Sequence, residues 1–596
     1  MRKKPLLQSR GSNTEGFSGK ETEAEYCIFS LQVYTVQNLC CILPVIIRHS
    51  REDKMIGYIT RKKAVAALLI LLLIVNGTIG TCFSLVMSAL IDCASGRKSE
   101  LLTTLLGSVL FVIVYVLVGT AYQYVKIYII AEARKNLKND LFECIYSRSM
   151  TEYEQGSSAE YINELSNNIN IFESTWFQNI IVSGDLIVSF VSAAVICIAV
   201  QPLMLLVMLV LAFLTLGITK ITTGPLEKSM REYSISLEEY TAEVKDDFSG
   251  FGVIHLFHTV NAVIHKHRQK NGGLESAKRK SENCRTYCAY AGQFVGLLST
   301  VLVMAAAAYF SQKGMFSAGM IIAFGHLIGN IVSPITAIPS VIADFHASKP
   351  VKESFCKILK TGKAEGGEGT VLPNGDIRLD RVTFGYGDKC VLNDCTYCFE
   401  NGKHYVLIGS SGEGKSSLLN LVAGIYQNYE GNISVGGADI RTAGRNHMAD
   451  AVAMVKQDTF LFNDSIRNNI TLFREGWSDQ ELTNVLAQTG LKEMISALPD
   501  GLETGIRENG SNFSGGEKQR IGLARALLHN SRILLLDEFT ANLDPKTAQE
   551  LEDNILNRRD TTVITVTHQR DEEKLKKYDC VVMLKDGKLE ECSQGR

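Results

Sequence analysis

A glycine-rich stretch with one lysine is the strongest chemical signal in the sequence. Residues 409–416 read Gly-Ser-Ser-Gly-Glu-Gly-Lys-Ser and fit the spacing G-x-x-x-x-G-K-S/T of a phosphate-binding loop. Residues 405–408 before it read as a buried strand, and Ser417 onward reads as a helix, which is the order that this motif requires. Backbone N–H groups and the helix dipole then converge on phosphate oxygens. The stretch predicts a nucleotide site, and its setting argues against a chance glycine-rich turn.

Two side chains of this phosphate loop, residues 409–416, have separate expected roles. Lys415 neutralises the β- and γ-phosphates, and Ser416 supplies an oxygen to Mg²⁺. ATP and Mg²⁺ are therefore the expected cofactors. The other residues predicted to contact the nucleotide here are Gly409, Ser410, Ser411, Gly412, Glu413, Gly414 and Ser417.

Acidic and histidine side chains follow two further hydrophobic strands. Residues 532–536 lead into Asp537 and Glu538, and residues 562–566 lead towards His568. Strand ends are where α/β sheets place ligand groups, so we expect Asp537 to hold Mg²⁺ and Glu538 to deprotonate the attacking water. His568 is placed to reach the γ-phosphate. A solvated acidic turn and a structural histidine are the alternatives, and the buried strands argue against both.

Two more features belong to the same chemistry. Tyr386 precedes the phosphate loop and is expected to stack on adenine, although a plain strand tyrosine is the alternative. Ser514, Gly515, Gly516 and Glu517 open a predicted helix and form a second turn with exposed N–H groups suited to an anion. Two phosphate-binding helix ends in one chain suggest that the second binds a nucleotide held by another copy.

Length and charge limit the remaining possibilities. A chain of 596 residues is too long for one core, and the formal charge of −2 gives no indication of a nucleic-acid partner, so none is expected. We divide the chain into an extension of unclear role, a membrane domain, a linker and a nucleotide-binding domain: residues 1–54, 55–350, 351–375 and 376–596.

Six apolar stretches in the membrane domain are each about long enough to cross the hydrocarbon core. They are placed near residues 64–91, 105–130, 177–200, 203–221, 287–310 and 318–343. The basic residues Arg61 to Lys63 and Arg134 to Lys138 favour a cytosolic position for both termini and the long links. Polar residues that are candidates for lining a water-filled cavity are Asn76, Gln293, His326 and Asn330. For His326, a role as an interhelical hydrogen-bonding residue is an equal alternative.

The 15 cysteines are scattered rather than set at disulfide spacings, which indicates a reducing environment for the soluble part. Cys390, Cys395 and Cys398 match part of an iron–sulfur ligand spacing. They lie in predicted strands with no fourth cysteine nearby, so strand thiols are the preferred interpretation and a cluster is the alternative.

Taken together, these motifs resemble the ATP-binding cassette (ABC) transporters, specifically an exporter-type half-transporter, over the chain from about Met55 to its end. The fold implied is an α-helical six-span membrane domain followed by an α/β P-loop NTPase domain of ABC type. The matching motifs are Walker A at 409–416, the Q-loop at Gln457, the signature at 514–517, Walker B at 534–538, the D-loop at 541–544 and the switch at His568.

The resemblance implies roles that spacing alone does not. Gln457 becomes a catalytic residue and a Mg²⁺ ligand, Asp544 a nucleotide-contacting residue, and two chains close head to tail so that Walker A of one faces the signature of the other. Residues 161–170 and 247–252 become coupling turns, and Glu508 contacts the partner. Glu517 departs from the commoner glutamine of the signature without removing a phosphate or metal ligand.

The expected function is ATP hydrolysis coupled to export of a lipid, peptide or hydrophobic small molecule by a dimer, either homodimer or heterodimer. The expected setting is the lipid bilayer of a plasma membrane, bacterial, with the nucleotide-binding domain in the cytoplasm. An importer of a metal-chelating molecule with an exporter-like fold is the alternative. A soluble ATPase acting on nucleic acid or ribosomes and an ATP-gated channel are the rivals from other classes.

Overall fold

The computed structural model describes residues 55–96, 101–154, 156–361, 370–386, 389–568 and 572–592. The expected extension, residues 1–54, lies outside them. The chain forms two compact units. The first contains the residues through Phe142 and Asn163–Lys357, and the second contains Glu143–Ile162 and the residues from Ile358 onward.

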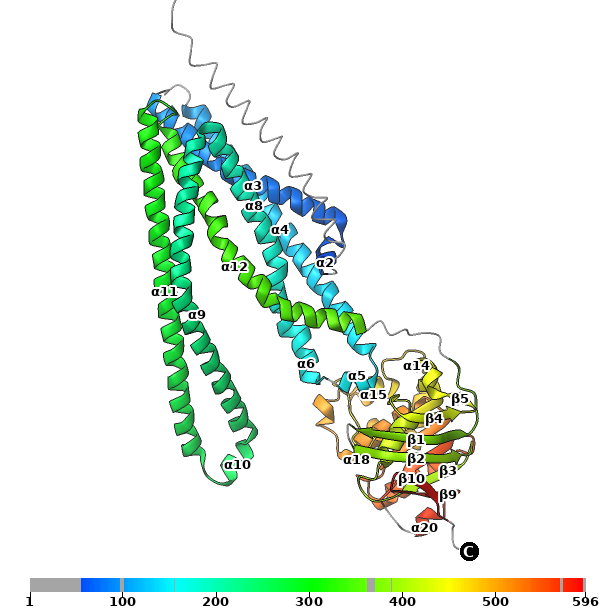
Figure 1. Ribbon diagram of the computed structural model, residues 1–596. Helices are drawn as coiled ribbons and strands as arrows, with labels where there is room; N and C mark the ends of the chain where they lie inside the picture. Colours follow the sequence, from blue (N-terminus) through cyan, green and yellow to red (C-terminus); the bar gives the residue numbers. More distant parts are fainter. Residues whose placement is uncertain are drawn as a thin grey trace, which may run out of the picture. The chain divides into compact units, whose positions relative to one another are not determined.

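The first unit is helical (Figure 1). Its helices are α2 (Ile56–Thr60), α3 (Lys63–Gly96), α4 (Leu101–Tyr146), α7 (Ile169–Phe172), α8 (Gln178–Val200), α9 (Pro202–Ser249), α10 (Phe251–Leu256), α11 (Val260–Gln312) and α12 (Gly319–Thr361). Five stretches among the described helices are long and apolar enough to cross a membrane: 63–94, 101–146, 158–200, 260–312 and 319–360. They contain five of the six expected spans. The fourth expected span lies in α9, where the apolar stretch Pro202–Gly217 is shorter.

Many apolar side chains of these helices face outward. Leu106, Leu110 and Leu117 of α4 are each at least 60% exposed. Side chains of this kind are stable in such positions when lipid, rather than water, surrounds them. The exposed apolar surface of α4 therefore fits a lipid-facing helix.

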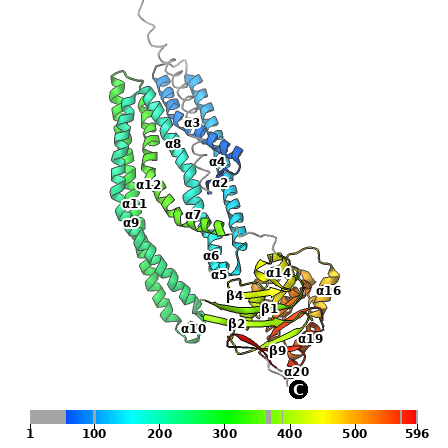
Figure 2. The same cartoon turned by 45° about the vertical axis from the view of Figure 1, so that its right-hand side comes forward.

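Helices α9 and α11 run side by side, and α10 joins them at one end (Figure 2). Ion pairs tie the two long helices together outside their apolar stretches: Lys280 Nζ lies 2.6 Å from Glu232 Oε2, and Lys266 Nζ lies 3.2 Å from Glu243 Oε1. The helical turns that carry these ion pairs are too polar for the hydrocarbon of a bilayer. The ends of α9 and α11 that α10 joins therefore extend beyond the bilayer.

The segment that leads into α8 is wound unevenly. Two π-helical turns, η2 (Glu164–Asn168) and η3 (Glu173–Phe177), flank α7. An aromatic cluster packs beside them, with the Phe172 ring centroid 5.1 Å from that of Trp176 and 5.4 Å from that of Phe355 on α12. The wider turns let these large rings point towards α12 from one short segment.

The second unit contains two sheets. The antiparallel sheet has the order β2-β1-β4-β5, and the mostly parallel sheet has the order β10-β9-β3-β8-β7-β6. The strands are β1 (Ile377–Tyr386), β2 (Lys389–Phe399), β3 (His404–Ile408), β4 (Glu430–Val435), β5 (Ala438–Asp439), β6 (Val452–Val455), β7 (Ile533–Asp537), β8 (Thr562–Val566), β9 (Cys580–Lys585) and β10 (Lys588–Glu591).

Burial explains why three central strands of the parallel sheet are continuous apolar runs. Every residue of β3, β7 and β8 is buried, because helices and neighbouring strands cover both faces. Helix α13 (Lys415–Val422) follows β3, and helix α19 (Pro545–Leu556) follows β7. In this parallel arrangement the carboxyl ends of β3, β7 and β8 meet at one edge, which collects the residues that follow them.

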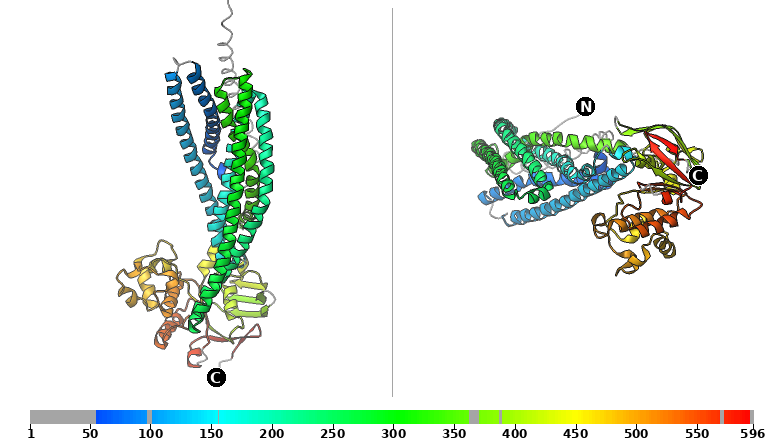
Figure 3. Two further views of the ribbon diagram at one scale, coloured as in Figure 1. Left: turned by 90° about the vertical axis from the view of Figure 1, so that its left-hand side faces the viewer. Right: turned by 90° about the horizontal axis from the view of Figure 1, so that it is seen from below.

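The described α-helices of this unit not yet named are α5 (Met150–Glu154), α6 (Ser158–Asn163), α14 (Arg445–Ala451), α15 (Ile466–Thr471), α16 (Asp479–Gln488), α17 (Lys492–Ser496), α18 (Gly515–Leu528) and α20 (Glu572–Leu575). Of these, α15, α16, α17 and α18 share one apolar core and form a helical lobe. Figure 3 shows the helices between β6 and β7, in yellow to orange, on the opposite side of the unit from the antiparallel strands.

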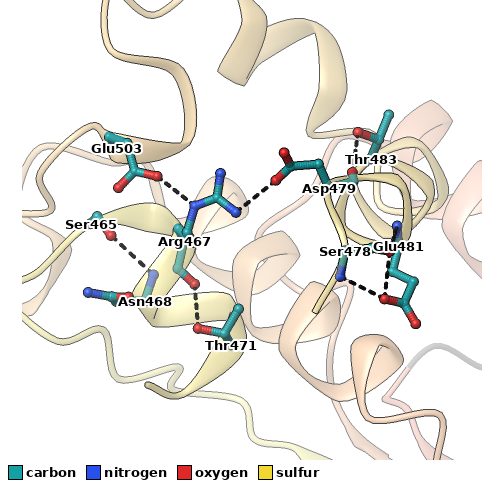
Figure 4. Close-up of polar contacts among 9 residues, drawn as sticks. All are labelled: Ser465, Arg467, Asn468, Thr471, Ser478, Asp479, Glu481, Thr483 and Glu503. Atoms are coloured by element: carbon teal, nitrogen blue, oxygen red, sulfur yellow. Dashed lines mark hydrogen bonds and ion pairs between the residues drawn. The ribbon is translucent and has the colours of Figure 1, made fainter. Parts of the chain in front are cut away.

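Arg467 holds part of this lobe together (Figure 4). Its Nε lies 2.6 Å from Glu503 Oε1 and its Nη1 lies 3.0 Å from Asp479 Oδ1 at the start of α16. Ser478 and Glu481 close a capping box on that same helix start. One guanidinium thus joins three chain segments, although surface ion pairs of this kind contribute only about 1 kcal/mol or less.

The three clustered cysteines all lie on β2. Cys395 is buried, and Cys390 and Cys398 are exposed. Alternation of buried and exposed positions is the ordinary pattern of a strand. Among the described residues no three His, Cys, Asp or Glu side chains form a metal-binding group, so the structure gives the iron–sulfur alternative no support.

Candidate functional site

The phosphate loop lies between β3 and α13, as its motif predicts. Gly412 and Gly414 have φ values of +84° and +99°, in the left-handed region, where L side chains are strained. A side chain at position 414 would also collide with Val391. Glycine is therefore required at 414 for both backbone shape and space.

Lys415 is nearly buried and folds over the loop. Its Nζ donates to the carbonyl oxygens of Gly409, at 2.9 Å, and Ser410, at 2.7 Å. Within the same loop, the backbone N–H of Ser410 donates to Glu413 Oε2 at 2.7 Å. The ammonium group thus lies within the curve of the loop, where phosphate oxygens would be its alternative partners.

Asp537 and Ser416 come together at the carboxyl end of β7. Burial raises the pKa of the Asp537 carboxyl, whereas a hydrogen bond from the Ser416 hydroxyl lowers it; the neighbouring Glu538 carboxylate raises it further. A buried carboxylate beside a hydroxyl is an oxygen donor set of the kind that Mg²⁺ prefers. These two side chains therefore fit a magnesium ion, and its charge would offset the cost of burying Asp537.

We expect Asp537→Asn to stabilise the ligand-free protein. Because the folded-state pKa of Asp537 is raised, folding disfavours the ionised form, and its contribution to the free energy of unfolding falls as pH rises above the ordinary pKa of an aspartate. Asparagine lacks this penalty. The melting temperature of the variant should exceed that of the wild type near pH 7, with a smaller difference at about pH 4.

Calorimetry of the ligand-free full-length protein across this pH range checks the expectation. Glu552→Gln is a matched variant at a position outside the proposed metal site. Burial raises the pKa of Glu552 as well, so this variant should show a pH dependence of the melting temperature in the same direction. A melting temperature of Asp537→Asn at or below the wild-type value near pH 7 would contradict it.

Three residues predicted to act in catalysis meet at Glu538. Glu538 Oε2 accepts a hydrogen bond from Gln457 Nε2 at 2.8 Å, and Glu538 Oε1 lies 2.6 Å from His568 Nε2. Glu538 itself has a φ of +48°, an uncommon conformation for a residue with a side chain. The two contacts fix the orientation of the carboxylate, which is what a general base requires.

Tyr386 ends β1 next to the start of α13. Its hydroxyl lies 3.3 Å from Ser417 Oγ, and its side chain is 46% exposed. The ring of Tyr386 packs edge-on against Phe384, at a centroid distance of 5.1 Å. An exposed ring held beside the phosphate loop is suited to stacking on a base.

The signature turn, residues 514–517, caps α18. Ser514 Oγ and its backbone N–H both donate to Glu517 Oε2, at 2.8 and 2.7 Å, and the Glu517 N–H donates to Ser514 Oγ. Gly515 and Gly516 leave the remaining N–H groups at the helix start unobstructed by side chains. The glutamate that departs from the family pattern thus completes a capping box rather than disrupting the turn.

Asp544, the remaining predicted contact residue, caps α19. Its Oδ1 accepts a hydrogen bond from the Thr547 N–H at 3.0 Å, and hydrogen bonds to Thr547 lower the pKa of its carboxyl. Within this chain Asp544 therefore has a structural role, and its expected nucleotide contact stays a prediction.

Sequence reasoning missed two polar positions. Gln519 is 2% exposed. Its side chain donates a hydrogen bond to the Gln457 carbonyl at 3.4 Å and accepts one from the Asn542 N–H at 3.2 Å, so it links the residues around Gln457 to those around Asp544.

The second missed position lies in the membrane helices, where Asp185 accepts a hydrogen bond from Tyr122 at 2.7 Å. A single aspartate in the apolar run of α8 was the available signal for the second.

Comparison with known proteins gives two family matches. Residues 66–335 match the model described as "ABC transporter transmembrane region", and residues 392–541 match the model described as "ABC transporter". Together these segments span more than half of the chain.

Individual relatives agree with these matches. The chain is 23% identical over 544 residues to an uncharacterized ABC transporter ATP-binding protein of Bacillus subtilis, covering 89% of each chain. It is 32% identical over 340 residues to an ATP-dependent lipid A-core flippase of Yersinia pestis, covering 56% of each. A bacterial Atm1-family ABC exporter with ATP bound matches in structure with a TM-score of 0.74 at 21% identity, covering 88% of this chain and 94% of that one.

Proposed function

Because the chain belongs to the ABC transporter family, as an exporter-type half-transporter with both family regions fused, we propose that it hydrolyses ATP to export a solute. The observation that carries this proposal is the arrangement at the end of β7, where Gln457 and His568 both contact the Glu538 carboxylate. A protein that only bound nucleotide would have no need of an oriented general base there.

Each residue of the site has a separate proposed role in ATP hydrolysis. The phosphate loop and Lys415 hold the β- and γ-phosphates, and Tyr386 supports the adenine. Ser416 and Asp537, whose side chains meet, would hold Mg²⁺ together with Gln457, which the family motif assigns, and the ion would neutralise charge on the phosphate oxygens. Glu538 accepts a proton from the attacking water, and His568 orients its carboxylate. These assignments rest on the contacts described above and on the family motifs.

A second chain completes the proposed transporter. The signature turn offers an anion site beyond the one at the phosphate loop, and half-transporters of this family act in pairs. The tip formed by α10 and its neighbours has a separate role in the proposal: Phe248, Leu256 and Phe257 are 74%, 74% and 69% exposed beyond the apolar stretches of α9 and α11. A group of exposed apolar residues outside the bilayer marks a surface that binds another protein domain, and we propose that this tip docks on a nucleotide-binding domain.

We expect Leu256→Glu to lower the rate of ATP hydrolysis in lipid about tenfold, because a charge on this apolar tip would oppose docking. The exposed position predicts little effect on folding. ATPase activity in proteoliposomes checks the expectation, with Leu256→Met as the matched control that keeps the apolar surface. Unchanged activity of Leu256→Glu would rule out a docking role for the tip.

The solute is proposed to be a lipid, peptide or hydrophobic small molecule, and the membrane a bacterial plasma membrane. The related lipid A-core flippase of Yersinia pestis supports the lipid class, and none of the comparisons reported above favours the importer alternative.

Uptake into inverted vesicles tests the proposal. The assay uses ATP and a panel of labelled lipids, peptides and hydrophobic compounds, with Glu538→Gln vesicles as the blank. ATP-dependent accumulation inside inverted vesicles supports export, and accumulation only in right-side-out vesicles overturns its direction.

A further inference from the structure

Three aromatic rings contact one another in the second unit, and one of them is Tyr386, the residue expected to stack on adenine. The Tyr426 ring stacks on Phe384 with a centroid distance of 5.5 Å and an interplanar angle of 27°. Tyr386 meets Tyr426 edge-on at 5.7 Å and Phe384 edge-on at 5.1 Å. The exposed Tyr386 ring is therefore supported by the other two, and its tilt depends on where Tyr426 lies.

A carboxylate from far back in the chain holds Tyr426. The Tyr426 hydroxyl donates to Glu154 Oε1 at 3.1 Å, across 272 residues of sequence. Glu154 ends α5, and α5 belongs to the segment Glu143–Ile162 that forms one compact unit with the nucleotide-binding residues. This segment includes the last residues of α4, from Glu143 to Tyr146, so the contact ties the end of a membrane helix to the aromatic group.

The hydroxyl groups of Tyr426 and Tyr386 extend this series of contacts from Glu154 to the start of α13, next to the phosphate loop. Burial raises the pKa of Tyr426, and the adjacent Tyr386 hydroxyl and the Glu154 carboxylate raise it further, so Tyr426 stays protonated and remains a hydrogen-bond donor at neutral pH. Tyr386 in turn lies 3.3 Å from Ser417 Oγ at the start of α13. Glu154, Tyr426, Tyr386 and Ser417 thus follow one another in a series.

We propose that Glu154 and Tyr426 are positioning residues that set the orientation of Tyr386 and thereby the affinity for the adenine of ATP. The inference rests on the proposed role of Tyr386 as the adenine-stacking residue. It makes nucleotide affinity dependent on the segment Glu143–Ile162, so that a movement of α4 changes base binding through one hydrogen bond.

The physical argument concerns what Tyr426 does without its acceptor. A ring held by one stacked and one edge-on contact gains about 0.5–1.5 kcal/mol from each, which leaves it free to shift when its hydroxyl loses a charged partner. Stacking on adenine weakens as a result, whereas the backbone contacts of the phosphate loop are unaffected.

The test separates adenine binding from phosphate binding in the full-length protein. Affinity for a fluorescent ATP analogue is measured directly, and ATP and inorganic tripolyphosphate are each used as competitors. We expect Glu154→Ala and Tyr426→Phe to raise the Kd for ATP about threefold to tenfold, with no change for tripolyphosphate. The double variant should be no weaker than either single variant, since both remove the same hydrogen bond.

Two further variants sharpen the result. Glu154→Gln keeps an acceptor oxygen and should recover part of the affinity, and Glu160→Ala removes another carboxylate of the same segment and should have no effect. Unchanged ATP affinity in Glu154→Ala, or an equal loss for tripolyphosphate, would overturn the inference. Tyr386→Ala separates the proposed stacking role of Tyr386 from the proposed positioning role of Glu154. If Tyr386→Ala leaves ATP binding unchanged, the stacking role is wrong. If Tyr386→Ala weakens ATP binding and Glu154→Ala does not, only the positioning role is wrong.

Discussion

The Glu538→Gln variant is expected to bind ATP nearly as well as the wild type and to hydrolyse it at least about 100 times more slowly. Glutamine has the same shape as glutamate but cannot accept a proton from water at neutral pH. It can still accept a hydrogen bond from Gln457, so the surrounding structure should be retained. The loss therefore falls on the chemical step rather than on binding.

Two measurements check this expectation. Phosphate release in proteoliposomes gives the rate, and a fluorescent ATP analogue gives the affinity. His568→Ala is an informative companion, because it removes the group 2.6 Å from Glu538 Oε1 while leaving the base itself. It should retain more activity than Glu538→Gln. Wild-type hydrolysis by Glu538→Gln would exclude Glu538 as the base.

The sequence predicted the elements of this site well because each motif is local. A strand, a turn and a helix are adjacent in the chain around residues 409–416, and the run into Asp537 is one buried strand. Parallel pairing of β3, β8 and β7 then places their ends together. Gln457 was identified only through the family resemblance. It lies 81 residues from Glu538 in the sequence, and no local pattern predicts that the two side chains meet.

The features that sequence reasoning missed depend on packing between distant segments. Tyr426 reads as an ordinary loop aromatic, and Glu154 as one of several acids after a membrane helix. Only the folded chain shows that they share a hydrogen bond. The π-helical turns before α8 are similar, since they accompany the packing of Phe172 against Trp176 and Phe355 and have no residue pattern of their own.

The signature turn carries the second large prediction, because its partner is proposed to be a nucleotide on another chain. Gly515 is the position to change. A Cβ there would meet Asn542 at 3.4 Å, an ordinary contact, whereas at Gly516 it would approach the Asn542 carbonyl to 2.8 Å. Gly515→Asp should therefore fold, and aspartate in the first turn of a helix is itself favourable. Its charge would repel phosphate, so we expect hydrolysis to fall at least about tenfold, with Gly515→Asn as the neutral control of equal size.

Mixing the two inactive variants shows where the signature acts. In a dimer of Glu538→Gln with Gly515→Asp, one composite site carries both defects and the other carries neither, if each site pairs the phosphate loop of one chain with the signature turn of its partner. We expect such mixed dimers, isolated with two different tags, to recover up to about half of the wild-type hydrolysis per dimer, although either variant alone has little. If each chain used its own signature turn, both sites would carry a defect and no activity would return. Recovery therefore requires a site shared between two copies of this chain, and its absence would exclude that site.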